Sequence, residues 1–346
     1  MSCNGWHRPC RERRLKVVHE LSGAAIAGTG HAVPERVVTN FDLEKMVDTS
    51  DEWIRTRTGI RERRVADENT ATSDLAVAAA REALDMAGMA PSDLDLIVVA
   101  TVTPDMLFPS TACLVQDRLG AAHAAAFDLS AGCSGFVYAL ATAAQFIQTG
   151  AYSNALVVGA ETLSKITDWQ DRSTCVLFGD GAGAVVLKAA PAGKGLVSFV
   201  LGADGSGKDK LRLPAGGSRL PASAETVAQR QHYIQMCGHD VFRFAVRVLG
   251  EATREALEKA GLGLNQLDFF VPHQANVRII DAAVERLELP KEKVIVNVDR
   301  FGNTSAASVA IALDEAVRSG RIQPGQVVAM TGFGAGLTWA SAVFRW

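Results

Sequence analysis

Residues 126–136 read Ala-Phe-Asp-Leu-Ser-Ala-Gly-Cys-Ser-Gly-Phe, and this stretch joins two different structural patterns. The apolar run from Ala124 to Leu129 is typical of a buried strand, and Phe136 to Ile147 has the spacing of a helix. The small residues between them predict a turn that places Cys133 at the helix N-terminus. Unpaired N–H groups and the helix dipole favour an anion there. We therefore expect a thiolate that is accessible near neutral pH.

The strand around Phe127 belongs to a pattern that occurs twice in the chain. Three segments of the first half have counterparts at nearly one spacing in the second half, which indicates a duplicated unit. The paired segments begin at Leu94 and Leu267 (173 residues apart), Phe127 and Val298 (171 apart), and Ala155 and Gln326 (171 apart).

Buried strands and long helices alternate along both halves, which predicts an α/β fold with mixed sheets and helical layers. We place the junction near 189–195, with halves at 21–190 and 191–346. Residues 204–223 are expected to form a loop beside the active-site cleft. The predicted strands include 96–100, 156–159 and 327–330, and the predicted helices include 73–88, 110–119, 242–260 and 306–318.

Two further residues lie in unusual local sequences of the second half. His273 lies in Val-Pro-His-Gln-Ala-Asn, and Asn303 lies in Gly-Asn-Thr-Ser-Ala-Ala-Ser. Taken singly, a structural histidine, a turn asparagine and a buried apolar cysteine are the commoner interpretations. Together, Cys133, His273 and Asn303 provide the groups of an acyl-transfer site. We expect them to meet where the strand ends of the two halves converge.

Composition excludes several classes of protein. The net charge of −3 gives no general attraction to nucleic acid, and no apolar stretch reaches membrane-spanning length. The six cysteines lack a CxxC pair and metal-ligand spacing, which favours a reducing compartment and predicts no metal site. Residues 1–20 are basic and are interpreted as a flexible N-terminal extension rather than a signal peptide.

The local sequences described so far, with three more, resemble the β-ketoacyl-acyl carrier protein synthase III family. These are the initiating condensing enzymes of dissociated fatty acid synthesis. The resemblance runs from about Ala25 to Trp346 and implies a thiolase-like fold with five αβαβα layers. The additional motifs are Asp48-Thr-Ser-Asp-Glu-Trp-Ile, Arg57-Thr-Gly-Ile-Arg-Glu-Arg-Arg and Phe178-Gly-Asp-Gly-Ala-Gly-Ala.

The resemblance implies a two-part reaction in a multifunctional enzyme. Cys133 takes a short acyl group, expected to be acetyl, from acyl-CoA, and malonyl-acyl carrier protein then loses CO₂ and condenses with it. His273 and Asn303 stabilise the enolate, and the backbone N–H groups of Cys133 and Ala335 form an oxyanion hole. Ala335 stands where the family often has Gly, and a simple turn is an equally good interpretation there. Acyl-CoA is a substrate, and no cofactor or metal is implied.

The resemblance also implies binding residues and partners. A cytoplasmic homodimer is expected, in which Phe108 closes the neighbour's acyl pocket and favours short starters. Arg278 matches the docking arginine for acyl carrier protein, and Arg243 and Arg286 are weaker candidates that a solvated helix face explains nearly as well. A solvated arginine is likewise a serious alternative for Arg57, and His239 stands where the family often has Asn. The residues expected to bind CoA are Thr49, Trp53, Arg57, Arg172, Asn276 and His239.

Other functions remain as alternatives. A starter-unit ketosynthase or acyltransferase of a polyketide or quinolone pathway shares Cys, His and Asn, and a non-catalytic partner subunit would be expected to lose the nucleophile. Thiolase would need a second cysteine near the C-terminus, and an elongating condensing enzyme would need His at Asn303. The glycines at 28–30 and 179–183 lack the remaining residues of nucleotide-binding motifs and are interpreted as close packing.

Overall fold

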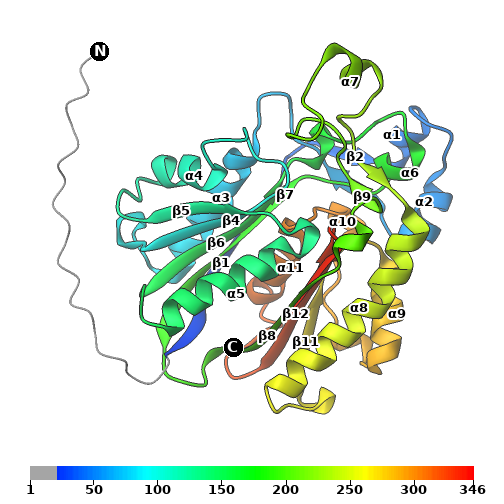
Figure 1. Cartoon of the computed structure of the whole chain (residues 1–346). Helices are drawn as coiled ribbons and strands as arrows, with labels where there is room; N and C mark the ends of the chain where they lie inside the picture. Colours follow the sequence, from blue (N-terminus) through cyan, green and yellow to red (C-terminus); the bar gives the residue numbers. More distant parts are fainter. Residues whose placement is uncertain (1–21) are drawn as a thin grey trace, which may run out of the picture.

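The computed structural model describes residues 22–346, so the predicted extension at 1–20 lies outside the described residues. Two groups of strands meet edge to edge through one pair, Ala24 with Gly195 (Figure 1). Parallel and antiparallel pairs occur in both groups, as the sequence predicts. The first half has the order β5-β4-β6-β7-β1, and the second half has β11-β12-β13-β8. The strands are β1 Gly23–Ala32, β4 Leu96–Ala100, β5 Ala125–Leu129, β6 Asn154–Glu161, β7 Gly181–Ala190, β8 Gly195–Ala203, β11 Phe269–Pro272, β12 Val327–Gly334 and β13 Thr338–Arg345.

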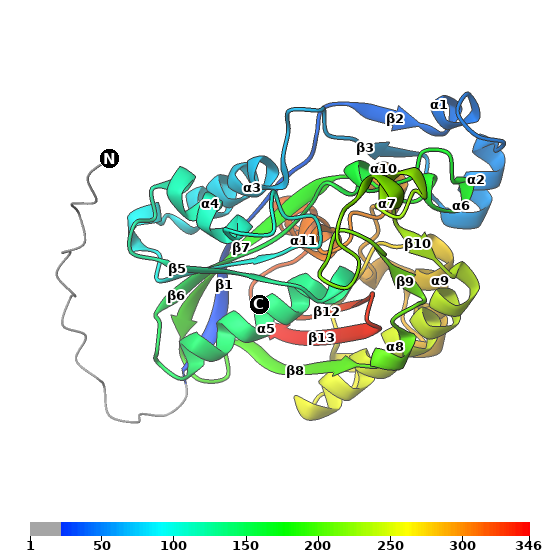
Figure 2. The same ribbon diagram turned by 45° about the horizontal axis from the view of Figure 1, so that its top comes forward.

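Helices separate and cover the two groups of strands (Figure 2). Two central helices lie between the groups and share one core with strands of both halves, while two helices cover each outer face. This is the predicted order of five αβαβα layers. The central helices are α5 Gly135–Gln148 and α11 Ala307–Arg318; the outer helices are α3 Thr72–Ala87 and α4 Thr111–Leu119 on the first half, and α8 Gly238–Lys259 and α9 Val277–Leu287 on the second.

Smaller elements surround the end of the sheets where the site lies. The predicted loop at 204–223 carries a short strand, β9, which pairs with β10. A hairpin of β2 and β3 with two short helices adds a separate lobe at the same end (Figure 2). These elements are β2 Val37–Thr39, α1 Asn40–Glu44, α2 Asp51–Thr58, β3 Glu62–Arg64, α6 Arg172–Cys175, β9 Leu211–Arg212, α7 Ala224–Ala228, β10 Gln235–Met236 and α10 Val298–Phe301.

The two halves correspond element by element except at one strand. Val298 was aligned with the strand at Phe127, but it lies in α10, and the second half keeps only an isolated bridge between Phe270 and Val294. The side chain of Gln274 explains the difference. It donates to the carbonyl of Ile295 (3.1 Å) and accepts from the N–H of Asn297 (3.0 Å), so it takes backbone groups that a strand ladder would use.

Gly28 and Gly30 lie where β1 packs directly on α3. A Cβ atom at either position would come within 2.4 Å of a backbone oxygen of the helix. Close packing therefore requires these glycines, in agreement with the interpretation of this motif. The predicted boundary at residue 190 coincides with the end of β7. No helix among residues 22–346 combines the length and apolar character needed to cross a membrane.

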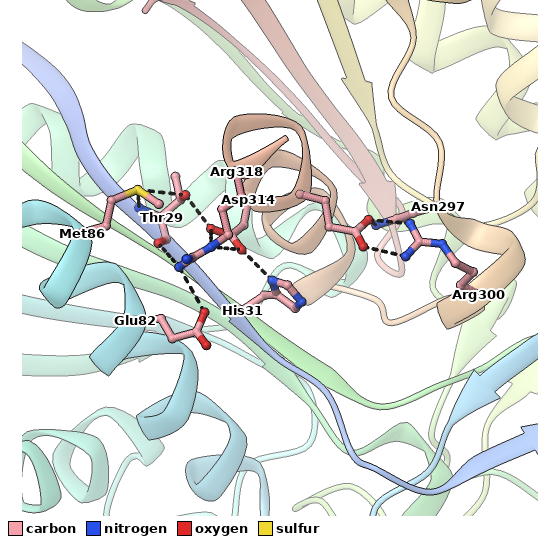
Figure 3. A network of polar contacts seen from close by, with 9 residues as sticks. Thr29, His31, Glu82, Met86, Asn297, Arg300, Asp314 and Arg318 are labelled. Atoms are coloured by element: carbon pink, nitrogen blue, oxygen red, sulfur yellow. Dashed lines mark hydrogen bonds and ion pairs between the residues drawn. The ribbon is translucent and has the colours of Figure 1, made fainter. Parts of the chain in front are cut away.

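A polar network centred on the buried Asp314 ties β1 to α3 and α11 (Figure 3). Asp314 on α11 accepts hydrogen bonds from Thr29 (2.6 Å) and Arg318 (2.9 Å), and it pairs with His31 (2.5 Å). Arg318 reaches on to Glu82 of α3 (3.1 Å). The network therefore links an outer helix, a strand of the first half and a central helix of the second half.

Candidate active site

Cys133 lies in a one-turn helix, Gly132–Ser134, between β5 and α5, where the sequence places it. Gly132 has a positive φ of 55°, and a Cβ there would lie 2.7 Å from the backbone nitrogen of Ala335. Gly334 of β12 packs equally closely on the nitrogen of Cys133. Glycines on both sides thus bring the β12–β13 turn against Cys133, which is 8% exposed.

His273 and Asn303 come from the second half and line one cavity together with Cys133. The Nδ1 atom of His273 lies 2.6 Å from the hydroxyl of Ser308, and that oxygen also accepts from the N–H of Gln274 (3.4 Å). We therefore assign the Ser308 hydroxyl as the donor and Nδ1 as the acceptor. The ring proton of neutral His273 then lies on Nε2. The Oδ1 atom of Asn303 accepts from the N–H of Ser305 (2.9 Å), so its NH₂ group is the end left for a substrate.

Two cavities meet at Cys133. The first, which we call the approach cavity, has a volume of about 160 Å³ and contains Cys133, His273, Asn276 and Asn303 in its wall. The second, which we call the apolar pocket, has a volume of about 150 Å³ and is walled by Cys133, Val102, Leu163, Ile166, Ile234 and Ser305. Leu211 of β9 lines both cavities, so the predicted loop does flank the site.

The resting protonation states follow from burial. Burial raises the pKa of the Cys133 thiol to about 12; the hydrogen bond from Ser305 and the thiol's own backbone N–H act in the other direction, and the charge of Glu161 raises it further. The expected thiolate near neutral pH is therefore wrong for the resting site, because desolvation outweighs the helix terminus. Burial lowers the pKa of His273 to about 3, so its imidazole is neutral, as its predicted role as an N–H donor requires.

Ala335 lies in the turn that faces Cys133 and forms part of the apolar pocket. It does not have a positive φ, and the positive φ in this turn belongs to Gly336 (138°). Replacement of a glycine by alanine at 335 therefore causes no backbone strain. The hydroxyl of Thr338 lies 2.8 Å from the carbonyl of Ala131 and 3.0 Å from that of Ala335, which fixes the turn relative to the nucleophile loop.

The predicted adenine-binding pair, Trp53 and Arg172, is in direct contact. The guanidinium carbon of Arg172 lies 4.4 Å from the centre of the Trp53 ring, and its Nη1 donates to the carbonyl of Asp48 (2.9 Å). A base between the two faces requires Arg172 to swing away. Thr49 has a buried hydroxyl that has no hydrogen-bond partner among the described residues.

The expected pantetheine contacts differ in their geometry. Asn276 lines the approach cavity, while its side chain caps α9 and donates to the carbonyl of Arg57 (3.1 Å). Arg57 itself is exposed. The side chain of His239 is 82% exposed, and Gly238 forms this part of the cavity wall instead.

The predicted docking and dimer residues lie on the surface. Arg278 and Arg286 are exposed on α9, and Arg243 on α8 donates to Asp240 (3.0 Å). Phe108 is 84% exposed in the loop after β4, beside Leu107, which is 81% exposed. A larger hollow of about 770 Å³ lies between β2 and Trp169, apart from Cys133, and contains none of the three catalytic candidates.

Sequence reasoning missed two residues near Cys133. Glu161, at the end of β6, is fully buried and accepts a hydrogen bond from Ser305 (3.0 Å). Ser305, in the same motif as Asn303, lines the apolar pocket together with Cys133 and lowers the pKa of its thiol. A carboxylate that ends an otherwise apolar strand, Leu156–Ala160, was the available signal for Glu161.

The duplicated five-layer fold, with cysteine, histidine and asparagine around one cavity at its seam, defines a condensing acyltransferase of the thiolase superfamily. Residues 127–205 and 257–346 match the families described as 3-oxoacyl-(acyl-carrier-protein) synthase III and its C-terminal domain. The β-ketoacyl-(acyl-carrier-protein) synthase III of Caldanaerobacter subterraneus is 61% identical over 94% of this chain and 99% of its own. The chain belongs to the 3-oxoacyl-(acyl-carrier-protein) synthase III family.

Solved structures agree with this assignment. The 3-oxoacyl-(acyl-carrier-protein) synthase III of Aquifex aeolicus has a TM-score of 0.87 and 51% identity, covering 94% of this chain and 100% of its own. The priming β-ketosynthase of the R1128 polyketide pathway has the same TM-score at 41% identity, covering 96% and 98%. The fold is shared by both branches, while the higher identity favours the fatty-acid branch over the polyketide alternative.

Proposed function

We propose that the chain loads a short acyl group from acyl-CoA onto Cys133 and condenses it with malonyl-acyl carrier protein, the first condensation of fatty acid synthesis. The observation that carries this proposal is the arrangement of Cys133, His273 and Asn303 around one cavity, with an apolar pocket on the other side of the sulfur. The proposed chemistry needs no metal or cofactor, because the thioester already activates the acyl group.

In the loading step the sulfur of Cys133 attacks the thioester carbonyl, and the CoA thiol leaves with a proton. The developing oxyanion is stabilised by the backbone N–H groups of Cys133 and Ala335. This role is supported by the close packing of the two backbones across Gly132. The acyl chain then extends into the apolar pocket.

In the condensation step the malonyl group loses CO₂, and its enolate carbon attacks the acyl group on Cys133. The bond from sulfur to carbon breaks, which regenerates the thiolate and forms the β-ketoacyl product. The Nε2–H of neutral His273 and the amide of Asn303 donate to the enolate oxygen. Each well-placed donor contributes about 3 kcal/mol to the barrier reduction.

The apolar pocket supports a short starter. A dry cavity of about 150 Å³ holds a ligand the size of benzene, so this pocket suits chains of up to roughly six carbons. The exposed ring of Phe108, inserted from a second copy, would shorten the space further. Phe108→Thr is therefore expected to shift selectivity toward longer acyl-CoAs, measured as kcat/KM across a series of chain lengths. Unchanged selectivity in the purified variant would count against this role.

A homodimer is supported by the free edge of β5. This strand ends the first half's sheet, and none of its five residues is fully buried. The adjacent loop exposes Met106, Leu107 and Phe108, an apolar group that a second copy would cover. Light scattering on purified protein tests the oligomeric state, and Leu107→Asp is expected to weaken the dimer.

CoA and acyl carrier protein are both proposed to bind at the end of the sheets where the site lies. Trp53, Arg172, Thr49 and Arg57 would receive the nucleotide part of CoA, and Arg278 the acidic carrier protein. Arg278→Glu is expected to raise KM for malonyl-acyl carrier protein at least tenfold and to leave KM for acetyl-CoA unchanged. We also propose a cytoplasmic location, which the free cysteines 113, 133, 175 and 237 support.

Intact-protein mass spectrometry tests the loading step directly. Incubation with acetyl-CoA should add one acetyl group, and Cys133→Ala should abolish the adduct. Addition of malonyl-acyl carrier protein should then release an acetoacetyl product. An unmodified wild-type protein would indicate a non-catalytic partner subunit instead.

A further inference from the structure

The proposed loading step requires a group that takes the proton of Cys133. The resting sulfur is a buried thiol, and two basic groups stand near it. His273 is one, and the carboxylate of Glu161 is the other, reached through the hydroxyl of Ser305. The geometry and the base strengths of these two groups decide between them.

We propose that Glu161 accepts the proton of Cys133 through Ser305, so that the loading step begins with a relay behind the nucleophile. Glu161 touches neither substrate nor sulfur; it is the base at the end of the relay, and the hydroxyl of Ser305 bridges it to Cys133. The inference concerns only how the nucleophile is ionised, and it rests on the proposed role of Cys133.

The contacts of Ser305 make it the bridge. Its Oγ atom donates to Glu161 Oε1 (3.0 Å), and Ser305 lines the apolar pocket together with Cys133, where hydrogen bonding of its side chain to the thiolate lowers the pKa of the thiol. The residue has a positive φ of 46°, and the N–H group is held by Asn303 Oδ1 (2.9 Å). The same loop therefore supplies a substrate donor and the bridging hydroxyl.

The surroundings of Glu161 keep its carboxylate ready to accept a proton. Its oxygens receive hydrogen bonds from Thr103 Oγ1 (2.5 Å), Thr101 Oγ1 (3.2 Å) and the N–H of Val102 (3.1 Å), all in the loop after β4. Ser305 is a further donor (3.0 Å), and the charge of Glu161 raises the pKa of the Cys133 thiol. Among the residues that the structure describes, none of the groups that bond to this carboxylate is a Lys, Arg or His.

Base strength favours Glu161 over His273. Burial raises the pKa of Glu161 to about 7, whereas burial lowers that of His273 to about 3. At neutral pH about half of the Glu161 groups are ionised, and these are the stronger base. Neutral His273 keeps its Nε2–H for the enolate.

The relay conserves protons and charge. Ser305 has one hydroxyl proton, which it donates to the Glu161 carboxylate while its oxygen accepts the proton of the thiol. The products are a thiolate, a serine hydroxyl that now donates to sulfur, and a neutral carboxylic acid. Protonation of Glu161 also removes the negative charge that raises the pKa of Cys133, so the two titrations are coupled.

Alkylation of Cys133 by iodoacetamide between pH 5.5 and 9.5 tests the relay without any acyl substrate. Peptide mass spectrometry separates Cys133 from the exposed Cys113 and Cys237. The wild-type rate is expected to rise through an inflection near pH 7, where Glu161 ionises. Glu161→Gln should abolish this inflection and slow alkylation at pH 8 at least tenfold.

Ser305→Ala should produce the same loss, because it removes the bridge and keeps the carboxylate. The matched control is Asp180→Asn. Asp180 is also fully buried, accepts from a serine hydroxyl, that of Ser164, and has a pKa raised by burial, but it lies outside the Cys133 site. This control should keep the wild-type profile.

The opposite result is equally well defined. If Glu161 only repels the thiolate, Glu161→Gln lowers the thiol pKa and alkylation becomes faster. A faster Glu161→Gln variant, or an inflection near pH 7 that this variant retains, overturns the relay. Acetyl loading by acetyl-CoA separates the two proposals. If the wild-type protein forms no acetyl adduct, the proposed function is contradicted. If it forms the adduct but Glu161→Gln and Ser305→Ala both keep the wild-type alkylation kinetics, only the relay is contradicted.

Discussion

Glu161 and Asp314 are both fully buried carboxylates, yet their surroundings give them opposite acidities. Burial acts to raise the pKa of Asp314, but hydrogen bonds from His31 and Thr29 and the charges of His31 and Arg318 outweigh it and leave the pKa lowered. Glu161 has only neutral donors, and burial raises its pKa to about 7. A cation within hydrogen-bond distance is thus what keeps a buried carboxylate ionised in this fold.

The two networks also differ in what they can do. The Asp314 network joins three layers of the fold and holds a permanent charge (Figure 3), which suits a structural tie. The Glu161 network reaches Ser305 beside Cys133, and burial raises the pKa of Glu161 to about 7, which suits proton transfer. Substitutions at the two carboxylates should therefore separate stability from reactivity.

The largest effect is expected from Asp314→Asn, which removes the charge that compensates Arg318 and His31. Asp314 is fully buried while Arg318 and His31 are partly exposed, so the loss is expected at the lower end of the range for breaking a buried pair, about 3 kcal/mol of unfolding free energy. Urea denaturation at pH 7 measures this loss. The control is Glu315→Gln, which breaks a half-exposed pair with Arg300 and should cost about 1 kcal/mol or less. Equal losses of unfolding free energy in the two variants would show that the Asp314 network stabilises the fold no more than the pair of Glu315 with Arg300.

Glu161→Gln should change the pH dependence of stability. The folded pKa of about 7 exceeds the unfolded 4.5, so the folded state holds the proton more firmly, and the wild-type unfolding free energy falls as pH rises through this window. The variant lacks this titration. Its stability relative to wild type should increase by about 3 kcal/mol between pH 4 and pH 8, as measured by denaturation at each pH. A constant difference would mean that Glu161 does not titrate near neutrality.

His31→Gln should have a smaller effect on stability. It should destabilise the protein more at low pH than at high pH. The hydrogen bond to Asp314 raises the pKa of His31, so its stabilisation is fully present below pH 6.5 and disappears as pH rises through the folded pKa. We expect the variant to lose about 1–2 kcal/mol at pH 5.5 and less at pH 9. Thermal unfolding at both pH values provides the measurement, and equal losses would show that the histidine does not change its protonation state between them.

The smallest effect is expected from Thr101→Val, which removes one neutral donor from Glu161. That hydrogen bond lowers the pKa of Glu161, so the inflection in Cys133 alkylation should move upward by less than about one pH unit. An inflection that moves downward would contradict the assignment of this titration to Glu161.

Much of the fold followed from local patterns. The strands at 96–100 and 327–330, the helix around Ser73–Gly88 and the turn at Cys133 lie where alternation of apolar runs and helical spacing predicts them. The segment at Val298, the counterpart of the strand at Phe127, forms a short helix instead, because the side chain of Gln274, more than 20 residues away, takes backbone hydrogen bonds of Ile295 and Asn297. A pattern read along the chain contains no such contact.

The candidate site was predicted less completely. The motifs brought Cys133, His273 and Asn303 to one cavity as expected, but they gave no indication that Arg172 stacks directly on Trp53 or that His239 points to solvent. Side-chain direction depends on neighbours from other elements. Glu161 was overlooked because a single carboxylate at a strand end is ordinary until its burial is known.

The amino-acid sequence by itself determined the duplicated α/β plan and the elements that carry the cysteine, histidine and asparagine, because periodicity and turn composition are local properties. Only the tertiary structure decided the charge states at the site. Desolvation and hydrogen bonds from remote segments leave Cys133 a thiol, His273 neutral and Glu161 close to half-ionised at pH 7. These quantities depend on what surrounds a group in space.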